Sequence, residues 1–280
     1  GGSSADDGFK GEWRQWSSHN GGMIGTTGCA FAMCFCSSLV HGQISSGFNP
    51  TGKQGTITKM DGPRHILEID NRPAAVVYNE WTGGEFTKLL QDASQDPDIG
   101  KASLYFPLGQ QLDADTADGE PFQRSLHPHM LVRATNSVTL FGDCHEGENI
   151  LMMAGTQAQV VNRISVVATN VVRDAGFRLP EVRGALVVFC AGAMAYVDSA
   201  MSVAASKLNA ALGGTPYLGI HMFGEQGVFP DGVSRHGNLM YSAVVVSSRR
   251  RVMKLLNVDT GETILETDPR FAALVQAGEI

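Results

Sequence analysis

The 280-residue sequence predicts a mixed α/β (α+β) fold in which helices flank β-sheets. Short apolar runs typical of strands alternate with two longer stretches of helical periodicity, an order that fits layered sheets and helices. The chain is 43% hydrophobic and 18% charged, so it has enough apolar material for a core. A disordered chain would instead combine low hydrophobicity with high charge. We expect two packed halves.

The first part of the chain is expected to be mostly β. Residues 1–22 are polar and glycine-rich, which predicts a disordered or loosely docked arm, and their opening is typical of a cloning scar or a truncation point. Residues 29–40 are almost wholly apolar, which predicts a buried strand. Residues 47–55 read as a turn region. Residues 55–69 alternate in part around Asp61-Gly62-Pro63, which predicts two strands and a tight turn.

Two helices and a further strand follow this region. Pro73 suits the first turn of a helix over residues 74–81. A shorter helix is expected at residues 85–93. Residues 102–108 are apolar and short, and they predict a strand.

The second part alternates strands with two long helices. Thr156 is placed to cap a helix that runs to residue 175, because apolar residues recur there at spacings of three and four. The glycine-rich stretch at residues 224–237 is expected to be a loop. A second helix is expected at residues 196–212. Strands are expected at residues 131–134, 137–141, 150–154, 185–190, 217–223 and 240–246.

The distribution of charge excludes several classes of partner. The net charge is −7, and the surplus of acidic residues lies in the first 150 residues, largely in acidic loops at 92–98 and 113–120 that predict a solvated surface. The one basic cluster, Arg249-Arg250-Arg251, is too small for a nucleic-acid footprint. No apolar run approaches the 18 residues of a membrane span, and no signal peptide is visible. We therefore expect a cytoplasmic protein without nucleic-acid or membrane partners.

The five cysteines do not predict a disulfide framework or a metal site. Their number is odd and their spacing irregular, which favours reduced thiols in an intracellular protein. Cys34 and Cys36 form a C-x-C pair, but no second pair is present to complete four zinc ligands. We expect no metal and no cofactor.

Several residues of the second part are candidates for a binding site. Glu225 lies between Gly224 and Gly227, and glycines allow the backbone to approach a ligand closely. Cys190 ends an apolar run, where it could line a pocket, fill the core or react as a thiol. The tentative ligand-binding set is Cys190, Gly192, Gly224, Glu225, His236 and Asn238. No residue is assigned a catalytic role.

Three stretches of the second half resemble the FIST family, the sensory domains of bacterial signalling proteins and of some F-box proteins. Residues 185–192, Ala-Leu-Val-Val-Phe-Cys-Ala-Gly, resemble its strand ending in Phe, Cys and Gly. Residues 216–225 resemble its P-x-x-G and G-E strand and turn. His236-Gly237-Asn238 lies where the family usually has His-Asn before its last strand.

The first half resembles the family more weakly. Residues 66–74 with Tyr78 are similar to its Asp-Gly, Pro-Ala, Tyr junction, and residues 105–109 and 146–147 are similar to two later positions. The resemblance covers residues 28–248. The chain departs from the family after the Cys-x-Gly turn, where Ala193 and Met194 replace a common Arg.

The resemblance implies a division of the chain. It places a FIST N-terminal-like half, trimmed at its start, at residues 23–145 and a FIST C-terminal-like half at residues 146–248. The more charged residues 249–280 are then expected to be a tether to a further module.

The resemblance also implies a function. A FIST domain is expected to bind a small metabolite, in the range of an amino acid or its derivative, and to signal to an attached or partner output domain. Two alternatives stay open. One is a thiol-dependent enzyme that uses Cys190 with His221 or His236. The other is a scaffold that recruits proteins, as in F-box-associated members. An enzyme is the less favoured reading.

Overall fold

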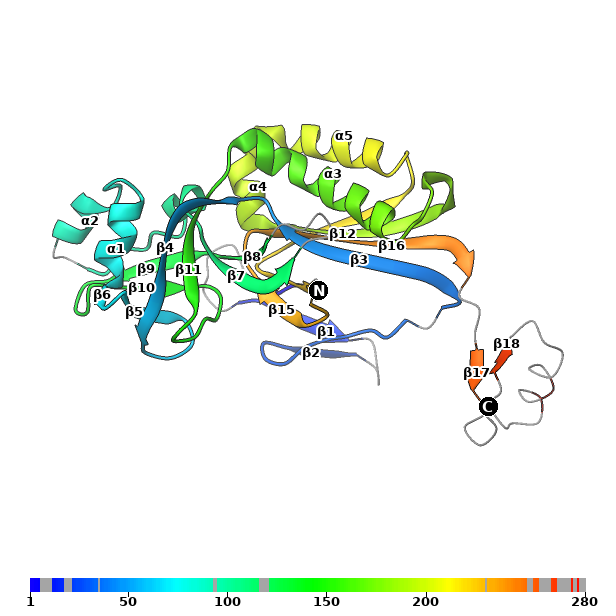
Figure 1. Ribbon diagram of the computed structural model, residues 1–280, viewed down its shortest axis with the longest axis horizontal. Coiled ribbons are helices and arrows are strands. Elements are labelled where there is room, and N and C mark those ends of the chain that lie inside the picture. Colours follow the sequence, from blue (N-terminus) through cyan, green and yellow to red (C-terminus); the bar gives the residue numbers. More distant parts are fainter. Residues whose placement is uncertain are drawn as a thin grey trace.

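The computed structural model describes residues 1–5, 12–17, 22–34, 36–92, 95–115, 121–229, 231–250, 254–256, 263–265, 273 and 276. It is a mixed α+β structure, as predicted, with two principal sheets that lie side by side along the molecule (Figure 1). Among the described residues, no helix has both the length and the apolar character needed to cross a membrane.

The first principal sheet is antiparallel and has eight strands. Its order is β8-β7-β11-β4-β5-β10-β9, and β6 pairs with β5 outside this path. The strands are β4 (Asn49–Met60), β5 (His65–Ile69), β6 (Arg72–Pro73), β7 (Leu108–Asp115), β8 (Pro121–Leu126), β9 (Pro128–Val132), β10 (Ser137–Leu140) and β11 (Asn149–Ala154). The helix α1 (Ala74–Trp81) and the 3-10 turn η2 (Ala102–Tyr105) pack against it, and α2 (Thr87–Gln91) lies beside them.

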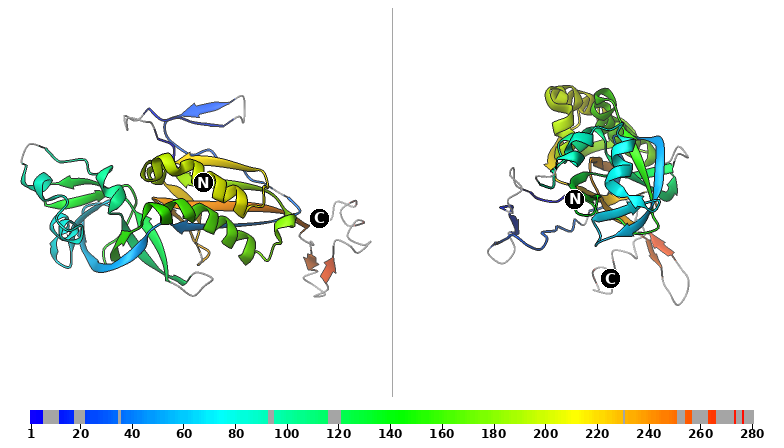
Figure 2. Two further views of the ribbon diagram at one scale, coloured as in Figure 1. Left: turned by 90° about the horizontal axis from the view of Figure 1, so that it is seen from above. Right: turned by 90° about the vertical axis from the view of Figure 1, so that its left-hand side faces the viewer.

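The second principal sheet has four strands in the order β13-β12-β16-β3. They are β3 (Ser38–Ser46), β12 (Val182–Cys190), β13 (Tyr217–Met222) and β16 (Met240–Arg250), and only β12 and β13 run parallel. One face is covered by α3 (Gln157–Asp174), α4 (Ala191–Val197) and α5 (Met201–Ala211), with α3 and α5 side by side (Figure 2). The turns η3 (Leu179–Glu181) and η4 (Asp198–Ala200) connect these elements.

Three hairpins complete the described structure. They are β1 (Gln15–Ser17) with β2 (Met23–Gly25), β14 (Glu225–Val228) with β15 (Ser234–Gly237), and β17 (Lys254–Leu256) with β18 (Thr263–Leu265). The β14–β15 hairpin packs against β3, β16 and β12. It therefore belongs to the four-stranded half and places Glu225 and His236.

The two halves are joined by the polypeptide chain itself and by a hydrogen bond between side chains. The chain passes from β3 in the four-stranded sheet to β4 in the eight-stranded sheet across only Gly47 and Phe48. The Ser46 and Ser125 hydroxyls share a hydrogen bond between β3 and β8. The core divides in the same way, with one apolar cluster under α3 and α5 and another around α1.

Several expected elements differ from those observed. Residues 29–34 form no strand and are exposed, and the strand begins only at Ser38, because no neighbouring strand pairs with the apolar run. The turn expected at residues 47–55 is largely the start of β4, which pairs with β11. Residues 102–105 form a 3-10 turn before β7. The glycine-rich loop expected at residues 224–237 contains the β14–β15 hairpin.

The second long helix is also interrupted. Helix α4 begins at Ala191, and it ends where Asp198 takes a φ of 48°, a left-handed conformation that breaks helical geometry. Helix α5 then begins at Met201. The single helix expected at residues 196–212 is therefore two helices with a 3-10 turn between them.

Candidate functional site

Glu225 is the most unusual polar side chain of the fold, because its carboxyl is fully buried. Its exposed fraction is 0%. The residue starts β14, directly after Gly224, whose φ of 93° makes the tight entry into the hairpin. Oε2 accepts a hydrogen bond of 3.0 Å from the Met240 backbone N–H, whereas Oε1 has no partner among the described residues. A buried polar atom without a partner is costly.

Burial changes the acidity of this carboxyl. Desolvation raises the pKa of Glu225 to about 8, although the hydrogen bond from Met240 and the neighbouring Cys190 thiol act in the opposite direction. Glu225 is therefore largely protonated at neutral pH.

Cys190 lies beside Glu225 at the carboxyl end of β12. Its side chain is buried, and β12 leads directly into α4 there. Burial, with a smaller contribution from the negative charge of Glu225, raises the pKa of the thiol far above its usual value. The absence of a side chain at Gly192 lets Leu239 pack close to the backbone there, because a Cβ at Gly192 would lie 2.8 Å from Leu239 Cδ2. The structure thus brings Cys190 together with Glu225, and Gly192 lies beside Cys190.

Tyr241 adds a second polar atom without a partner among the described residues, and no local motif marks this residue. Its hydroxyl is buried and has no hydrogen-bond partner among the described residues. Its ring meets Phe189 edge-to-face at 4.7 Å between centroids. Burial raises the pKa of Tyr241 well above its usual value, and the negative charges of Cys190 and Glu225 add to the effect. We call Cys190, Glu225 and Tyr241 the inner cluster.

His236 lies on a different face of the β14–β15 hairpin from Glu225. In the hairpin, Glu225 pairs with Gly237, and the next pair is Gln226 with His236. Because successive residues of a strand point to opposite faces, the side chains of Glu225 and His236 lie on opposite faces of the hairpin. The imidazole packs on Gly224, where a Cβ would lie 2.1 Å from His236 Nε2. Burial lowers the pKa of His236, as do Arg64 and Arg124, while Asp143 raises it. The inner site therefore does not include His236.

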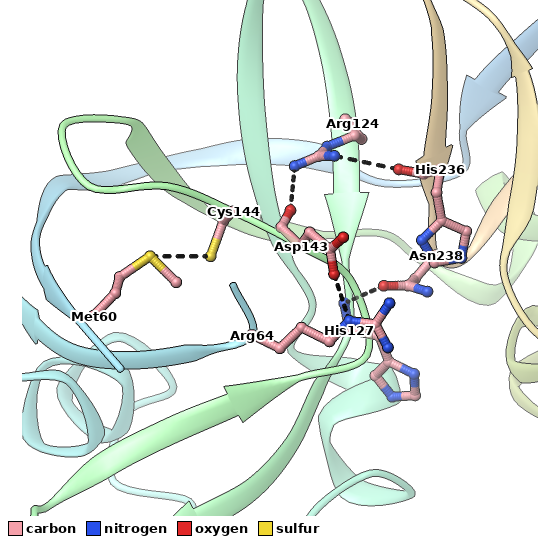
Figure 3. Close-up of polar contacts among 8 residues, drawn as sticks. All are labelled: Met60, Arg64, Arg124, His127, Asp143, Cys144, His236 and Asn238. Atoms are coloured by element: carbon pink, nitrogen blue, oxygen red, sulfur yellow. Dashed lines mark hydrogen bonds and ion pairs between the residues drawn. The ribbon is translucent and has the colours of Figure 1, made fainter. Parts of the chain in front are cut away.

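The charged residues around His236 come from both halves of the molecule (Figure 3). Arg124 on β8 donates hydrogen bonds to the backbone oxygens of Asp143, at 2.6 Å, and of His236, at 3.3 Å. The Arg64 guanidinium forms an ion pair with the Asp143 carboxylate. We call Arg64, Arg124, Asp143 and His236 the outer cluster. Arg64 and Arg124 carry no local motif, so only their place in the fold identifies them.

Asn238 holds the hairpin to the eight-stranded half. Its Oδ1 accepts a hydrogen bond of 3.3 Å from the His127 backbone N–H (Figure 3). The backbone N–H of Asn238 donates to the Ser125 backbone oxygen at 3.0 Å. The side chain is buried. Asn238, one of the residues predicted to bind a ligand, therefore makes hydrogen bonds to other residues of the protein at the junction of the two halves.

The geometry does not support thiol chemistry at Cys190. A nucleophilic cysteine needs a thiolate and an adjacent base. The raised pKa keeps Cys190 protonated. His221 lies on the edge strand β13 against Phe189, and His236 packs on Gly224. In the described part of the chain, no hydrogen bond joins either histidine to the thiol.

Two cavities open elsewhere in the helical half. A groove of about 300 Å³ between α3 and α5 is lined by Ser165, Thr169 and Lys207, among others. A second cavity, of about 130 Å³, lies between α5 and the β12–β13 edge and reaches Phe189 and His221. The inner cluster lines neither cavity. Within the described residues, no group of three or more His, Cys, Asp or Glu side chains is arranged to hold a metal ion.

Residues 1–3 lie against the inner site. Gly2 forms a bridge with Glu225, Ser3 donates its N–H to the Gly224 oxygen at 3.0 Å, and the Phe223 N–H donates to the Ser3 oxygen at 3.1 Å. This segment, expected within a loose arm, covers the start of β14.

Comparison with known families identifies both parts of the chain. The FIST N domain matches residues 1–72 and the FIST C domain matches residues 74–228, the latter covering more than half of the chain. The two matches meet at Pro73, just before α1, and the division of the packing halves at residues 145–146 stays a prediction. No curated protein and no solved structure matches the chain. The chain belongs to the FIST family, whose domains are sensory domains of signal-transduction proteins.

Proposed function

We propose that this FIST domain senses a small metabolite that binds at the inner cluster. The observation that carries the proposal is the fully buried Glu225 carboxyl, whose Oε1 has no hydrogen-bond partner among the described residues. Such a group is costly unless a further partner satisfies it. A ligand amino group would supply that partner, which fits an amino acid or one of its derivatives.

Binding at this site requires the protein to open. Glu225 is covered by the β14–β15 hairpin and by residues 1–3, and neither of the two cavities reaches it. A ligand shifts a conformational equilibrium only when it binds one state better than another. A ligand that favours an open hairpin would therefore alter the surface offered to an attached or partner output domain. The segment from residue 249 onward is the proposed route, and a cytoplasmic location is part of this proposal.

The proposal is tested by calorimetry and thermal shift with a panel of amino acids and simple amines. We expect at least one compound to bind and raise the melting temperature of the protein. Its affinity should rise with pH toward about 8, because an ammonium group selects the ionised carboxylate. Glu225→Gln should abolish that binding.

The matched control is Glu80→Gln. Glu80 is an exposed carboxylate paired with Arg72, so the same substitution is made far from the inner cluster. A flat response of the folded protein across the whole panel would count against the proposal. Equal binding by both variants would also contradict it.

A further inference from the structure

Arg124 is a buried cation to which no carboxylate of the described residues is hydrogen-bonded. Its exposed fraction is 8%, and both of its hydrogen bonds end on backbone oxygens, those of Asp143 and His236. The remaining guanidinium nitrogen, Nε, is buried and has no partner among the described residues. A guanidinium remains charged in proteins, and buried charges are normally paired. Arg124 therefore has donors in excess of its acceptors.

The surroundings of Arg124 increase the positive potential. Arg64 and Arg124 both act on His236, where each disfavours the protonated imidazole. Arg235 is also near enough to oppose the charge of Arg124, although it is itself paired with Asp231. Among the carboxylates, Glu148 has the larger effect on Arg124 and Asp143, which pairs with Arg64, the smaller. The Asp143 carboxylate, the one carboxylate of the outer cluster, therefore pairs with Arg64, whereas Arg124 contacts only the backbone oxygen of Asp143.

The outer cluster is open to solvent on one side. The Arg64 and Asp143 side chains are 55% and 51% exposed, whereas Arg124 lies beneath them. Figure 3 shows Arg64, Asp143, Arg124 and His236 converging from the turn before β5, the loop after β10, β8 and β15. An ion at this position would contact both halves of the molecule.

We propose that the outer cluster binds a small oxyanion, with Arg64 and Arg124 as its charge partners and His236 beside it. Arginine binds carboxylates and phosphates through parallel N–H donors, which is the geometry such an anion needs. Without the anion, the Asp143 carboxylate is the partner of the Arg64 guanidinium. When the anion binds, it replaces the Asp143 carboxylate as the partner of Arg64. The anion is either free in solution or the acidic group of a larger metabolite. The site lies on the opposite face of the hairpin from Glu225 and does not depend on the inner cluster.

The test is titration of the whole chain with inorganic phosphate and, separately, with acetate, followed by calorimetry and melting temperature. Sodium chloride keeps the ionic strength constant throughout. We expect saturable binding of at least one of the two anions. Phosphate alone would identify a phosphate-type ligand, acetate alone a carboxylate, and either outcome supports the site.

Arg64→Gln is the decisive variant, because Arg64 is exposed and its loss does not disturb the core. It should weaken anion binding about tenfold, as expected for loss of one charge-assisted hydrogen bond. The matched control is Arg72→Gln, another exposed arginine paired with a carboxylate. Arg124→Lys keeps the buried charge but removes the fork, and it should weaken binding while the protein still folds. Absence of saturable binding by both anions, or equal weakening by Arg64→Gln and Arg72→Gln, would overturn the proposal.

Discussion

At the scale of single residues, Glu225 controls how stability depends on pH. Its pKa is about 8 in the folded protein, because burial disfavours the ionised form, against an ordinary value of 4.5. A raised pKa means that the folded state holds the proton more tightly than the unfolded state. Its contribution to stability is therefore complete below pH 4.5 and is lost as the pH rises through about 8.

Glu225→Gln should remove this dependence. Between pH 5 and pH 8, the free energy of unfolding of the unchanged protein should fall by up to about 1.4 kcal/mol per pH unit from this one group. In the variant, the fall should be smaller by that amount. Chemical denaturation at a series of pH values measures both curves. Glu80→Gln serves as the control, since Glu80 is exposed and its pKa is lowered by Arg72; equal slopes in all three proteins would contradict the prediction.

Cys190 shows the same effect of burial on a thiol. Cys29, Cys34 and Cys36 are exposed, whereas Cys144 and Cys190 are buried and have raised pKa values. We expect three thiols to react rapidly with a disulfide reagent in the reduced, folded protein, and two to react only on unfolding. Cys190→Ala should leave the fast phase unchanged. A Cys190 that reacts as fast as the exposed thiols would restore the enzymatic alternative.

At the scale of elements, the N-terminus of α3 shows how local chemistry sets the boundary of a helix. Thr156 caps α3 through a capping box, in which its hydroxyl accepts from the Gln159 N–H while the Gln159 side chain accepts from the Thr156 N–H. The predicted cap is therefore confirmed. This local signal is visible in the sequence because it spans only four residues.

Thr156→Ala should lower the free energy of unfolding by about 1 kcal/mol, because a cap hydroxyl is lost from the helix that covers the four-stranded sheet. Thr169→Ala is the matched control, since Thr169 is exposed within α3 and its hydroxyl bonds only to the Ser165 oxygen of the same helix. Urea denaturation of both variants measures the difference. A loss at Thr156 no larger than that at Thr169 would show that the cap contributes nothing.

At the scale of the whole molecule, the two halves are connected by the chain between β3 and β4 and by a small number of polar contacts at their junction. Asn238 is central among them, because it joins the end of the hairpin to His127 and Ser125 of the eight-stranded half. Gly142 lies against it, and a Cβ there would be 2.7 Å from Asn238 Oδ1.

Asn238→Ala should destabilise the protein by about 1–3 kcal/mol, because the His127 N–H loses its acceptor in a buried place. Hydrogen exchange at the amides of β8 and β9 should become faster. The control is Asn149→Ala, whose amide lies on the surface and bonds only to Gln54. Unchanged exchange at the His127 amide would contradict the role assigned to Asn238.

Much of the fold could be predicted from local patterns, but the candidate site only in part. The apolar face of α3 and the strand at residues 185–190 could be predicted, because the periodicity and the length of an apolar pattern are enough to distinguish a helix from a strand there. Residues 29–34 were wrongly expected to be a buried strand, because apolar character alone does not supply a pairing partner. Cys190 and Glu225 meet, with Gly192 beside Cys190, whereas His236 turns away through strand alternation.

The sequence by itself determined the family, the mixed α+β class and the residue types available at the site, because motifs, periodicity and caps act over short stretches of chain. Only the tertiary structure decided which of them meet and in what state of charge. Arg124, Tyr241 and Arg64 carry no local signal. Burial leaves Arg124 Nε and the Tyr241 hydroxyl without partners among the described residues, and the fold places Arg64 close enough to act on His236. Desolvation and contact across the fold are properties of three-dimensional packing, which no short stretch of sequence contains.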